Sequence, residues 1–164
     1  MRLNIIDEKD LREKQAQTQW EFLKKYDEYS GRTSSDTYDV ETLLMETGNE
    51  VVLGGPGMGK STMCKKLFCQ ADAMQIAAGK VRLWDVARYM RDGLFFEAAL
   101  RKTMTQSMDF EFDKADIARS FSLLILDGLD ECGDYRRIVA KEIAIWGFGH
   151  PEQKIVVTSR PIGY

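Results

Sequence analysis

One stretch decides the fold of this chain: Gly54-Gly55-Pro56-Gly57-Met58-Gly59-Lys60-Ser61. It matches the pattern G-x-x-x-x-G-K-[ST] and directly follows a short apolar segment, residues 50–53. Glycines at these positions let successive backbone N–H groups point inward around phosphate oxygens. Residues 60–75 carry apolar side chains at i,i+4 spacing, which predicts a helix whose N-terminal end also favours an anion. The stretch therefore predicts a strand, a phosphate-binding loop and a helix.

The side chains at the end of this loop suit particular parts of a nucleotide. Lys60 would place a compact positive charge on the outer phosphates, and Ser61 would supply a hydroxyl to Mg²⁺. A glycine turn with an incidental lysine would not need an apolar strand before it and an amphipathic helix after it. The residues predicted to bind the nucleotide are Gly54, Gly55, Pro56, Gly57, Met58, Gly59, Lys60, Ser61 and Thr62.

A second apolar segment, Leu123-Leu124-Ile125-Leu126, ends in Asp127, with Asp130 and Glu131 close behind it. A carboxylate at the carboxyl end of a parallel strand lies where ligands bind in open α/β sheets. We expect Asp127 to hold Mg²⁺ together with Ser61. Either Asp130 or Glu131 would then polarise the attacking water.

A third segment, residues 154–158, also predicts a strand, and its polar end reads Thr158-Ser159-Arg160-Pro161. Parallel strands bring their carboxyl ends to one edge of the sheet, so this end should lie beside the other two motifs. Arg160 is expected to reach a γ-phosphate there and to report its presence. Pro161 ends the strand because it lacks a backbone N–H.

The rest of the chain alternates strands with helices, which predicts an α/β fold with a parallel sheet covered on both faces. A further strand is expected at residues 81–84, and residues 7–29 predict a solvated amphipathic helix that docks through Trp20 and Leu23. Residues 105–121 are polar and acidic and predict no particular element. Further helices are expected at residues 40–46, with Asp39 or Thr37 as the cap, at 94–104 and through 135–146.

Composition excludes several classes of function. The chain has 164 residues and a net charge of −3, which argues against a nucleic-acid module driven by positive charge. Its one histidine, His150, excludes His-pair metal sites and is expected to be a surface residue. No segment has the roughly 20 apolar residues of a membrane span, and no signal peptide is visible, so a cytoplasmic protein is expected. The cysteines are expected to be reduced thiols: Cys64, Cys69 and Cys132.

Taken together, the three motifs resemble the NACHT family of signal-transduction ATPases, which belong to the STAND class. The most distinctive part is Asp127-Gly128-Leu129-Asp130-Glu131, which is similar to that family's extended Walker B motif. Gly54–Ser61 corresponds to Walker A, and the Thr-Ser-Arg-Pro run at 158–161 is similar to sensor 1. The resemblance covers residues 40–164, whereas residues 1–39 are expected to form a charged helix and linker.

The resemblance implies a three-layer P-loop NTPase of the ASCE type that switches between ADP-bound and ATP-bound states. It implies ATP or ADP and Mg²⁺ as ligands, hydrolysis to ADP and phosphate, homo-oligomerisation of the full-length protein, and a role in immune or antiviral defence. Lys60 and Ser61 would bind phosphate and Mg²⁺, Asp127 would organise the metal, and Arg160 would sense the γ-phosphate.

The chain departs from the family at Tyr164, because the family continues there into a further strand, helical lid subdomains and a winged helix. We therefore expect the nucleotide-binding part of a larger switch, without that edge strand and lid. The family's fifth strand lies beside the phosphate-loop strand, so residues 50–53 are expected to form an exposed apolar edge. Because both that edge strand and the lid are missing, weak nucleotide binding and slow turnover are also expected.

Three rival functions are considered. A GTPase is rejected because Asp130-Glu131-Cys132-Gly133 lies past the strand end and Asp113-Lys114-Ala115-Asp116 comes before the acidic strand, in the wrong order. A small P-loop kinase needs an acceptor pocket and an arginine-bearing lid, for which only Arg136-Arg137 is available. A nucleotide-dependent interaction module that does not hydrolyse, or a truncated relic, stays open. The charged residues of 85–92 are expected to be a solvated helix face rather than a partner site.

Overall fold

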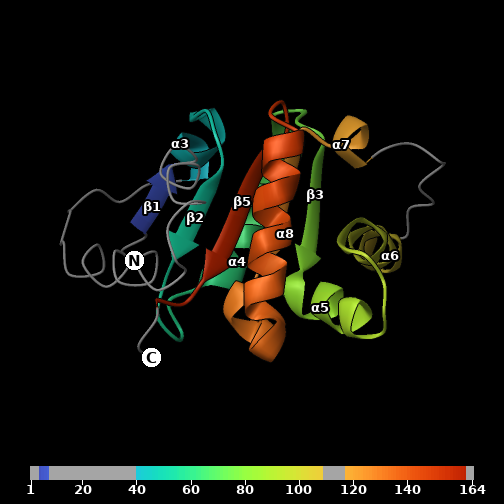
Figure 1. The fold of residues 1–164 in the computed structure, drawn as a ribbon. Helices are drawn as coiled ribbons and strands as arrows, with labels where there is room; N and C mark the ends of the chain where they lie inside the picture. The colour runs from blue at the N-terminus through green and yellow to red at the C-terminus, as the bar shows by residue number, and fades with distance from the viewer. Residues whose placement is uncertain (1–3, 8–39, 109–116, 162–164) are drawn as a thin grey trace.

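The computed structural model describes residues 4–7, 40–108 and 117–161, and these residues form one five-stranded sheet with helices on both faces (Figure 1). The strand order is β1-β2-β5-β4-β3. Strands β2 to β3 in this order are all parallel, and only β1 is antiparallel to its neighbour β2. The strands are β1 (Asn4–Asp7), β2 (Glu50–Leu53), β3 (Ala78–Arg82), β4 (Leu123–Asp127) and β5 (Lys154–Ser159).

The strand order assigns the chain to the P-loop NTPase fold. The phosphate-loop strand β2 is not beside the acidic strand β4, because β5 lies between them and pairs with both. This inserted strand is the mark of the ASCE type. The predicted fold class, a three-layer α/β P-loop NTPase with a mainly parallel sheet, is confirmed. Among the described residues, no strand follows β5.

The expectation of an exposed edge at residues 50–53 is wrong. Strand β1 pairs with the whole of β2, from Asn4 opposite Leu53 to Asp7 opposite Glu50. It takes the outer place beside β2, but runs in the opposite direction and comes from the N-terminal region, where no strand was predicted. One of the two premises for weak nucleotide binding, an unprotected phosphate-loop strand, is therefore removed. The other premise, the missing lid, is not affected by this pairing.

The two faces of the sheet bury alternate residues of the same strands, as the two-residue period of a strand requires. Along β4, Leu124 and Leu126 join one core cluster, whereas Leu123 and Ile125 join the other. Strand β5 divides in the same way, with Val156 on the side of Leu123. Strands buried on both faces read as continuous apolar runs, which is why these segments were recognisable in the sequence.

Helix α4 and the short helix α3 cover one face, while α5, α6, α7 and α8 build the other (Figure 1). The predicted helices near residues 40–46, 60–75, 94–104 and 135–146 are confirmed within a few residues. The helices are α3 (Val40–Met45), α4 (Lys60–Ala73), α5 (Leu83–Arg91), α6 (Phe96–Met108), α7 (Ile117–Ser120) and α8 (Arg136–Gly149), with a 3₁₀ turn η1 (Leu129–Tyr135) after β4.

One predicted strand has the wrong bounds. Residues 81–84 were expected to be a strand, but β3 ends at Arg82, and Leu83 and Trp84 already belong to α5. The strand starts earlier, and it includes Gly79, where an added Cβ would lie 2.3 Å from the Met104 methyl carbon. The close approach of α6 therefore requires glycine there, and a glycine in mid-strand weakens the sequence signal of a strand.

A buried ion pair ties α3 to the sheet at the edge opposite the phosphate loop. Lys154, at the start of β5, donates to the main-chain oxygens of Leu43 and Glu46 at the end of α3 and to Glu50 Oε1 at 2.9 Å. Glu50 is only 3% exposed, and its Oε2 has no hydrogen-bond partner among the residues that the structure describes. Burial raises the pKa of Glu50 to about 6, although Lys154 opposes the rise.

This raised pKa predicts a pH-dependent stability. The folded chain holds the Glu50 proton more tightly than the unfolded chain, so the contribution of Glu50 to stability should be fully present below pH 4.5 and be lost as the pH rises through about 6. A shift of this size corresponds to about 2 kcal/mol. The variant Glu50→Gln does not titrate, so its free energy of unfolding in urea should lack this fall. The exposed Glu152 offers the control Glu152→Gln, and an E50Q variant with the wild-type pH dependence would contradict the assignment.

Two predictions lie outside the described residues: the helix at 7–29 with Trp20 and Leu23, and the cap at Asp39 or Thr37. The Asp113–Asp116 segment of the GTPase comparison also lies outside them. Within the part of the chain that the structure describes, no helix has the length and apolar character that crossing a bilayer requires.

Candidate functional site

The predicted phosphate loop joins β2 to α4 at the carboxyl edge of the sheet, as the motif requires. Gly57 and Gly59 have φ of +70° and +81°, a region that favours glycine. No side chain caps the N-terminus of α4. Its first internal hydrogen bond runs from Met63 N to Gly59 O at 2.8 Å, so the N–H groups of Lys60, Ser61 and Thr62 precede it. This end of α4 is therefore a set of N–H donors of the kind that binds an anion.

Lys60 folds its side chain back over the loop. Its ammonium group donates to Gly54 O at 2.7 Å and to Gly55 O at 3.3 Å. A Cβ on residue 54 would lie 3.2 Å from Lys60 Cγ, which gives a packing reason for glycine at that position. The positive charge is thus held inside the loop by neutral carbonyl groups, where a phosphate would provide a stronger partner.

Hydrogen bonds connect residues within the loop to one another and connect the loop to β5. Gly55 N donates to Met58 Sδ at 2.9 Å, so Met58 lies against the loop backbone. Gly54 N donates to Ser159 O at 3.1 Å, which joins the start of the loop to the end of β5. Pro56, at the tip, is exposed. The carboxyl ends of the neighbouring strands β2 and β5 are therefore joined at the start of the loop.

Asp127 ends β4 as a buried carboxylate, with 8% of its surface exposed. Thr158 Oγ1 donates to Asp127 Oδ1 at 2.7 Å and accepts from Gly128 N at 2.9 Å. The threonine hydroxyl is itself fully buried. It therefore holds both the carboxylate and the beginning of the turn that follows it.

Replacing Thr158 by valine should destabilise the chain, because the isosteric side chain leaves Asp127 Oδ1 and Gly128 N without their common partner. Each unsatisfied buried group costs about 1–3 kcal/mol. We expect the free energy of unfolding of Thr158→Val to fall by that order, measured in urea. Thr158→Ser, which keeps the hydroxyl, should recover most of it. Equal losses in both variants would contradict the assignment, because serine keeps the hydroxyl that valine lacks.

Cys64 connects α4 to the acidic strand. It lies one turn after Lys60 and is fully buried. Burial raises the pKa of Cys64 to about 12, and the charge and hydrogen bonding of the adjacent Asp127 raise it further. Cys64 is therefore a neutral thiol packed against the carboxylate expected to hold Mg²⁺. This agrees with the prediction of reduced thiols for Cys64 and also for Cys132, whose pKa burial raises to about 12.

The turn η1 carries Asp130 and Glu131, the other two acids of the motif, and these two carboxylates have different partners. Asp130 is bound by Arg160 twice, through the main-chain N to Oδ1 at 3.1 Å and through Nε to Oδ2 at 2.9 Å. Arg160 was expected to face a γ-phosphate, and in this structure its guanidinium group is paired with Asp130. Both carboxylate oxygens of Asp130 are thus engaged.

Glu131 pairs instead with Arg82, whose Nη2 lies 3.5 Å from Glu131 Oε2. Both side chains are largely exposed, at 61% for Arg82 and 46% for Glu131. The pair is therefore weak and easily exchanged. The sequence analysis did not identify Arg82, because the strand was expected to continue to Trp84. With the strand ending at Arg82, its place beside the acidic edge follows from the pairing of Arg82 with Asp127.

The turn itself depends on Gly128. Its φ of +84° is in the left-handed region, and a Cβ there would lie 3.2 Å from the Glu131 carboxylate carbon. Glu131 N donates back to Gly128 O at 3.0 Å. Glycine at this position therefore allows the chain to turn directly after Asp127.

These groups suit a nucleotide with Mg²⁺. The donor set combines helix N–H groups, an ammonium group, the exposed Ser61 hydroxyl and the carboxylate of Asp127. Protein sites of this kind bind Mg²⁺ through one or two side chains together with phosphate oxygens and water. Ser61 and Asp127 would be those ligands. Across the described ranges, no group of three or more His, Cys, Asp or Glu side chains is arranged to hold a metal.

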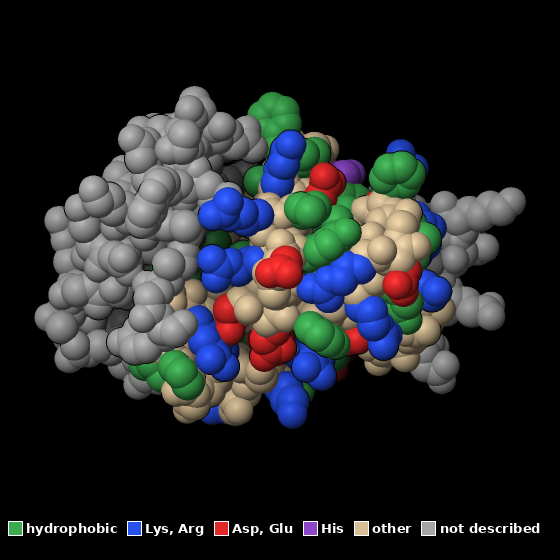
Figure 2. All heavy atoms as spheres, turned by 60° about the horizontal axis from the view of Figure 1, so that its bottom comes forward, with side chains coloured by type: hydrophobic (Ala, Val, Ile, Leu, Met, Phe, Trp, Pro, Cys, Tyr) green, Lys and Arg blue, Asp and Glu red, His purple; other side chains and the backbone are tan. Residues whose placement is uncertain are grey.

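The carboxyl edge of the sheet therefore gathers all three predicted motifs. Figure 2 views the molecule from this side, and acidic and basic side chains are interspersed there. His150 was expected on the surface, yet it is half-buried at the other end of α8, with its ring 4.2 Å from that of Trp146. It lies outside the site.

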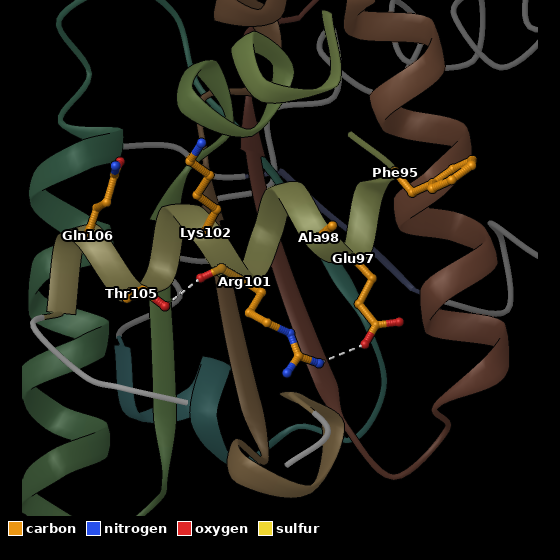
Figure 3. A pocket seen from close by; sticks show the side chains of 7 residues that line it. All are labelled: Phe95, Glu97, Ala98, Arg101, Lys102, Thr105 and Gln106. Carbon is orange, nitrogen blue, oxygen red and sulfur yellow. Dashed lines mark hydrogen bonds and ion pairs between the residues drawn. The ribbon is translucent and has the colours of Figure 1, made fainter. Parts of the chain in front are cut away.

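A groove of about 650 Å³ runs along the outer face of α6 and is separate from these motifs (Figure 3). Arg101 and Glu97 form an ion pair of 3.0 Å on this face, and Lys102 and Gln106 point the other way, towards α5. The residues that line the groove are Phe95, Glu97, Ala98, Arg101, Lys102, Thr105 and Gln106. None of them is a predicted nucleotide-binding residue.

No protein-family model matches this sequence, and no curated protein matches it. Among solved structures, the chain is similar to a DNA replication initiation factor, with a TM-score of 0.43 and 17% sequence identity. The similarity covers 67% of this chain and 30% of that one. The assignment of the fold rests on the strand order and on the loop after β2, and not on this similarity.

Proposed function

We propose that this chain is the ATP/ADP-binding core of a NACHT-type signalling switch, and that it hydrolyses ATP to ADP and phosphate with Mg²⁺. One observation carries the proposal. The uncapped N-terminus of α4 and the Lys60 ammonium group lie at the sheet edge that also presents Asp127 and the acidic turn.

In this proposal, the loop binds the phosphates before any chemistry takes place. Lys60 moves from the carbonyl groups of Gly54 and Gly55 to the outer phosphates, exchanging neutral acceptors for anionic ones. The N–H groups at the start of α4 complete the cradle. Bound Mg²⁺ would neutralise charge on the β- and γ-phosphate oxygens, with Ser61 and Asp127 as its protein ligands. Thr158 keeps the Asp127 carboxylate in place.

The water-activating residue is proposed to be Glu131 rather than Asp130. The sequence analysis left both open. Asp130 uses both oxygens on Arg160, and its side chain is only 11% exposed. Among the described residues, the Glu131 carboxylate has one ion-pair partner, the exposed Arg82, and this contact costs little to break. Arg160 would sense the γ-phosphate by exchanging its pair with Asp130 for the phosphate.

The signalling part of the proposal is supported by the acid-Gly-x-acid-acid run at 127–131 and by the Thr-Ser-Arg-Pro run at 158–161. Both resemble the NACHT family. On that resemblance, the full-length protein would oligomerise in the cytoplasm when ATP replaces ADP, in a defence response. Residues 40–164 would be its nucleotide-binding part, to which β1 adds a strand.

A nucleotide-dependent interaction module without hydrolysis is the second candidate. It is favoured by one observation: Asp130 and Glu131 already have cationic partners, Arg160 and Arg82. A carboxylate held by a cation must leave that partner before it can reach an attacking water. Binding without phosphate release would support this candidate over the ATPase.

The test is a calorimetric titration of the chain with ATP, ADP and GTP, each with Mg²⁺ and with a chelator. Phosphate release without any acceptor substrate is measured in parallel. We expect ATP and ADP to bind more tightly with Mg²⁺ than with the chelator. We also expect ATP to release phosphate when no acceptor substrate is present. No binding of any of the three at millimolar concentration would overturn the proposal. Formation of ADP that requires an added acceptor and takes place without release of free phosphate would instead indicate a kinase.

A further inference from the structure

An arginine of α5, Arg91, binds the main chain of the acidic turn η1 on the side away from β5. Arg91 Nη2 donates to Cys132 O at 2.6 Å, and Cys132 is the residue directly after Glu131. The charged group of Arg91 also lies over two aromatic rings, 5.6 Å from the ring centre of Trp84 and 5.0 Å from that of Tyr135. Arg91 was expected to belong to a solvated helix face, and the residue is exposed as expected. Its guanidinium group nevertheless contacts the main chain of the turn.

The position demands arginine rather than any cation. A guanidinium group is planar, so it can stack on aromatic rings while an N–H at its edge donates to a carbonyl. An ammonium group of lysine offers no plane to stack. The part of the η1 backbone beside Arg91 is Gly133. Its φ of +57° and ψ of −132° are not helical, and they produce a kink in the turn. A Cβ at Gly133 would lie 3.4 Å from Arg91 Nη2, so the kink and the contact occupy the same place.

The turn is thereby fixed from two sides. On the β5 side, Arg160 binds Asp130. On the α5 side, Arg82 at the start of the helix pairs with Glu131, and Arg91 at its end binds Cys132 O. The Arg82 pair is exposed and weak, so it constrains Glu131 little. The contact of Arg91 is with the main chain and does not depend on the state of either carboxylate.

We infer that Arg91 is a positioning residue for Glu131: it holds the main chain of η1 from α5, and through it sets where the Glu131 carboxylate lies during hydrolysis. This inference rests on the proposed function. Arg91 does not touch the nucleotide in this assignment. It acts on the water-activating step, and nucleotide binding by the loop is independent of it.

The test compares Arg91→Lys with Arg88→Lys, a matched control. Arg88 lies on the same helix, one turn earlier, and contacts only its own helix neighbours Asp85 and Tyr89 among the described residues. We expect R91K to lower kcat about tenfold with KM and ADP affinity within about twofold of wild type, because an interaction outside the binding step affects kcat alone. R88K should change neither.

A double-mutant cycle separates positioning from general destabilisation. If Arg91 acts through Glu131, R91K should have no further effect on the residual activity of Glu131→Gln. An equal loss in the wild-type and E131Q backgrounds would overturn the inference. So would a fall in ADP affinity that matches the fall in kcat.

A third readout needs no nucleotide. Hydrogen exchange of the amides in 129–135 should be faster in R91K than in wild type, and unchanged in R88K. Unchanged exchange in R91K would overturn the inference by itself. A wild-type chain that binds no nucleotide would instead overturn the proposed function, so the two failures are distinguishable.

Discussion

Replacing Lys60 by alanine should abolish nucleotide binding, with a dissociation constant for Mg²⁺-ATP raised at least about a hundredfold. The lysine is expected to donate roughly two charge-assisted hydrogen bonds to phosphate, each worth about 1.5–3 kcal/mol. No other ammonium group lies in the described loop, and Lys60 is also the residue that bridges Gly54 and Gly55. Titration calorimetry of the variant against wild type measures the loss.

The matched control is Lys66→Ala, which removes an exposed lysine from the same helix, α4. It should bind ATP as wild type does, which excludes a simple effect of net charge. Circular dichroism and thermal denaturation of both variants check that α4 has formed. A folded K60A variant that binds ATP within threefold of wild type would contradict the phosphate-loop assignment.

Replacing Glu131 by glutamine should lower the rate of phosphate release by about 10²–10³-fold and leave ATP affinity nearly unchanged. A general base contributes about 10²–10⁴-fold, and glutamine keeps the shape of the side chain while losing the ability to accept a proton. The contact with Arg82 Nη2 can persist through the amide oxygen. Steady-state phosphate release and single-turnover kinetics give the rate.

The comparison variant is Asp130→Asn. It weakens the pair with Arg160 and keeps Glu131, so its effect on the chemical step should be smaller than that of E131Q. A larger loss in D130N than in E131Q would transfer the role of base to Asp130. Turnover that E131Q leaves unchanged, in a chain that binds ATP, would favour the interaction module.

Much of the fold could be predicted because its signals are local. The apolar runs before Gly54 and at 123–126 are buried on both faces, and such runs are readable without knowing their neighbours. The helix after Lys60 shows its buried face by i,i+4 spacing. Strand β1 shows no such signal, since four residues at a sheet edge gain their structure only from pairing with β2.

The contacts within the site could be predicted only in part. The sequence analysis expected Asp127, the acidic turn and Arg160 at one edge, and the structure brings them there. It did not identify Thr158 as the partner of Asp127, or Arg160 as the partner of Asp130. These pairings depend on β5 lying next to β4, which is a property of the strand order and not of any one segment.

By itself, the sequence determined the residue types that are proposed to bind phosphate, the strands and helices that flank them, and the class of fold. These follow from backbone geometry and from the periodicity of apolar side chains, which act over a few residues. Only the tertiary structure decided that β1 protects β2, that Glu131 rather than Asp130 is loosely held, and that Arg91 supports the acidic turn. These contacts are between residues that lie tens of positions apart in the sequence. Packing and strand pairing decide which of these residues come into contact.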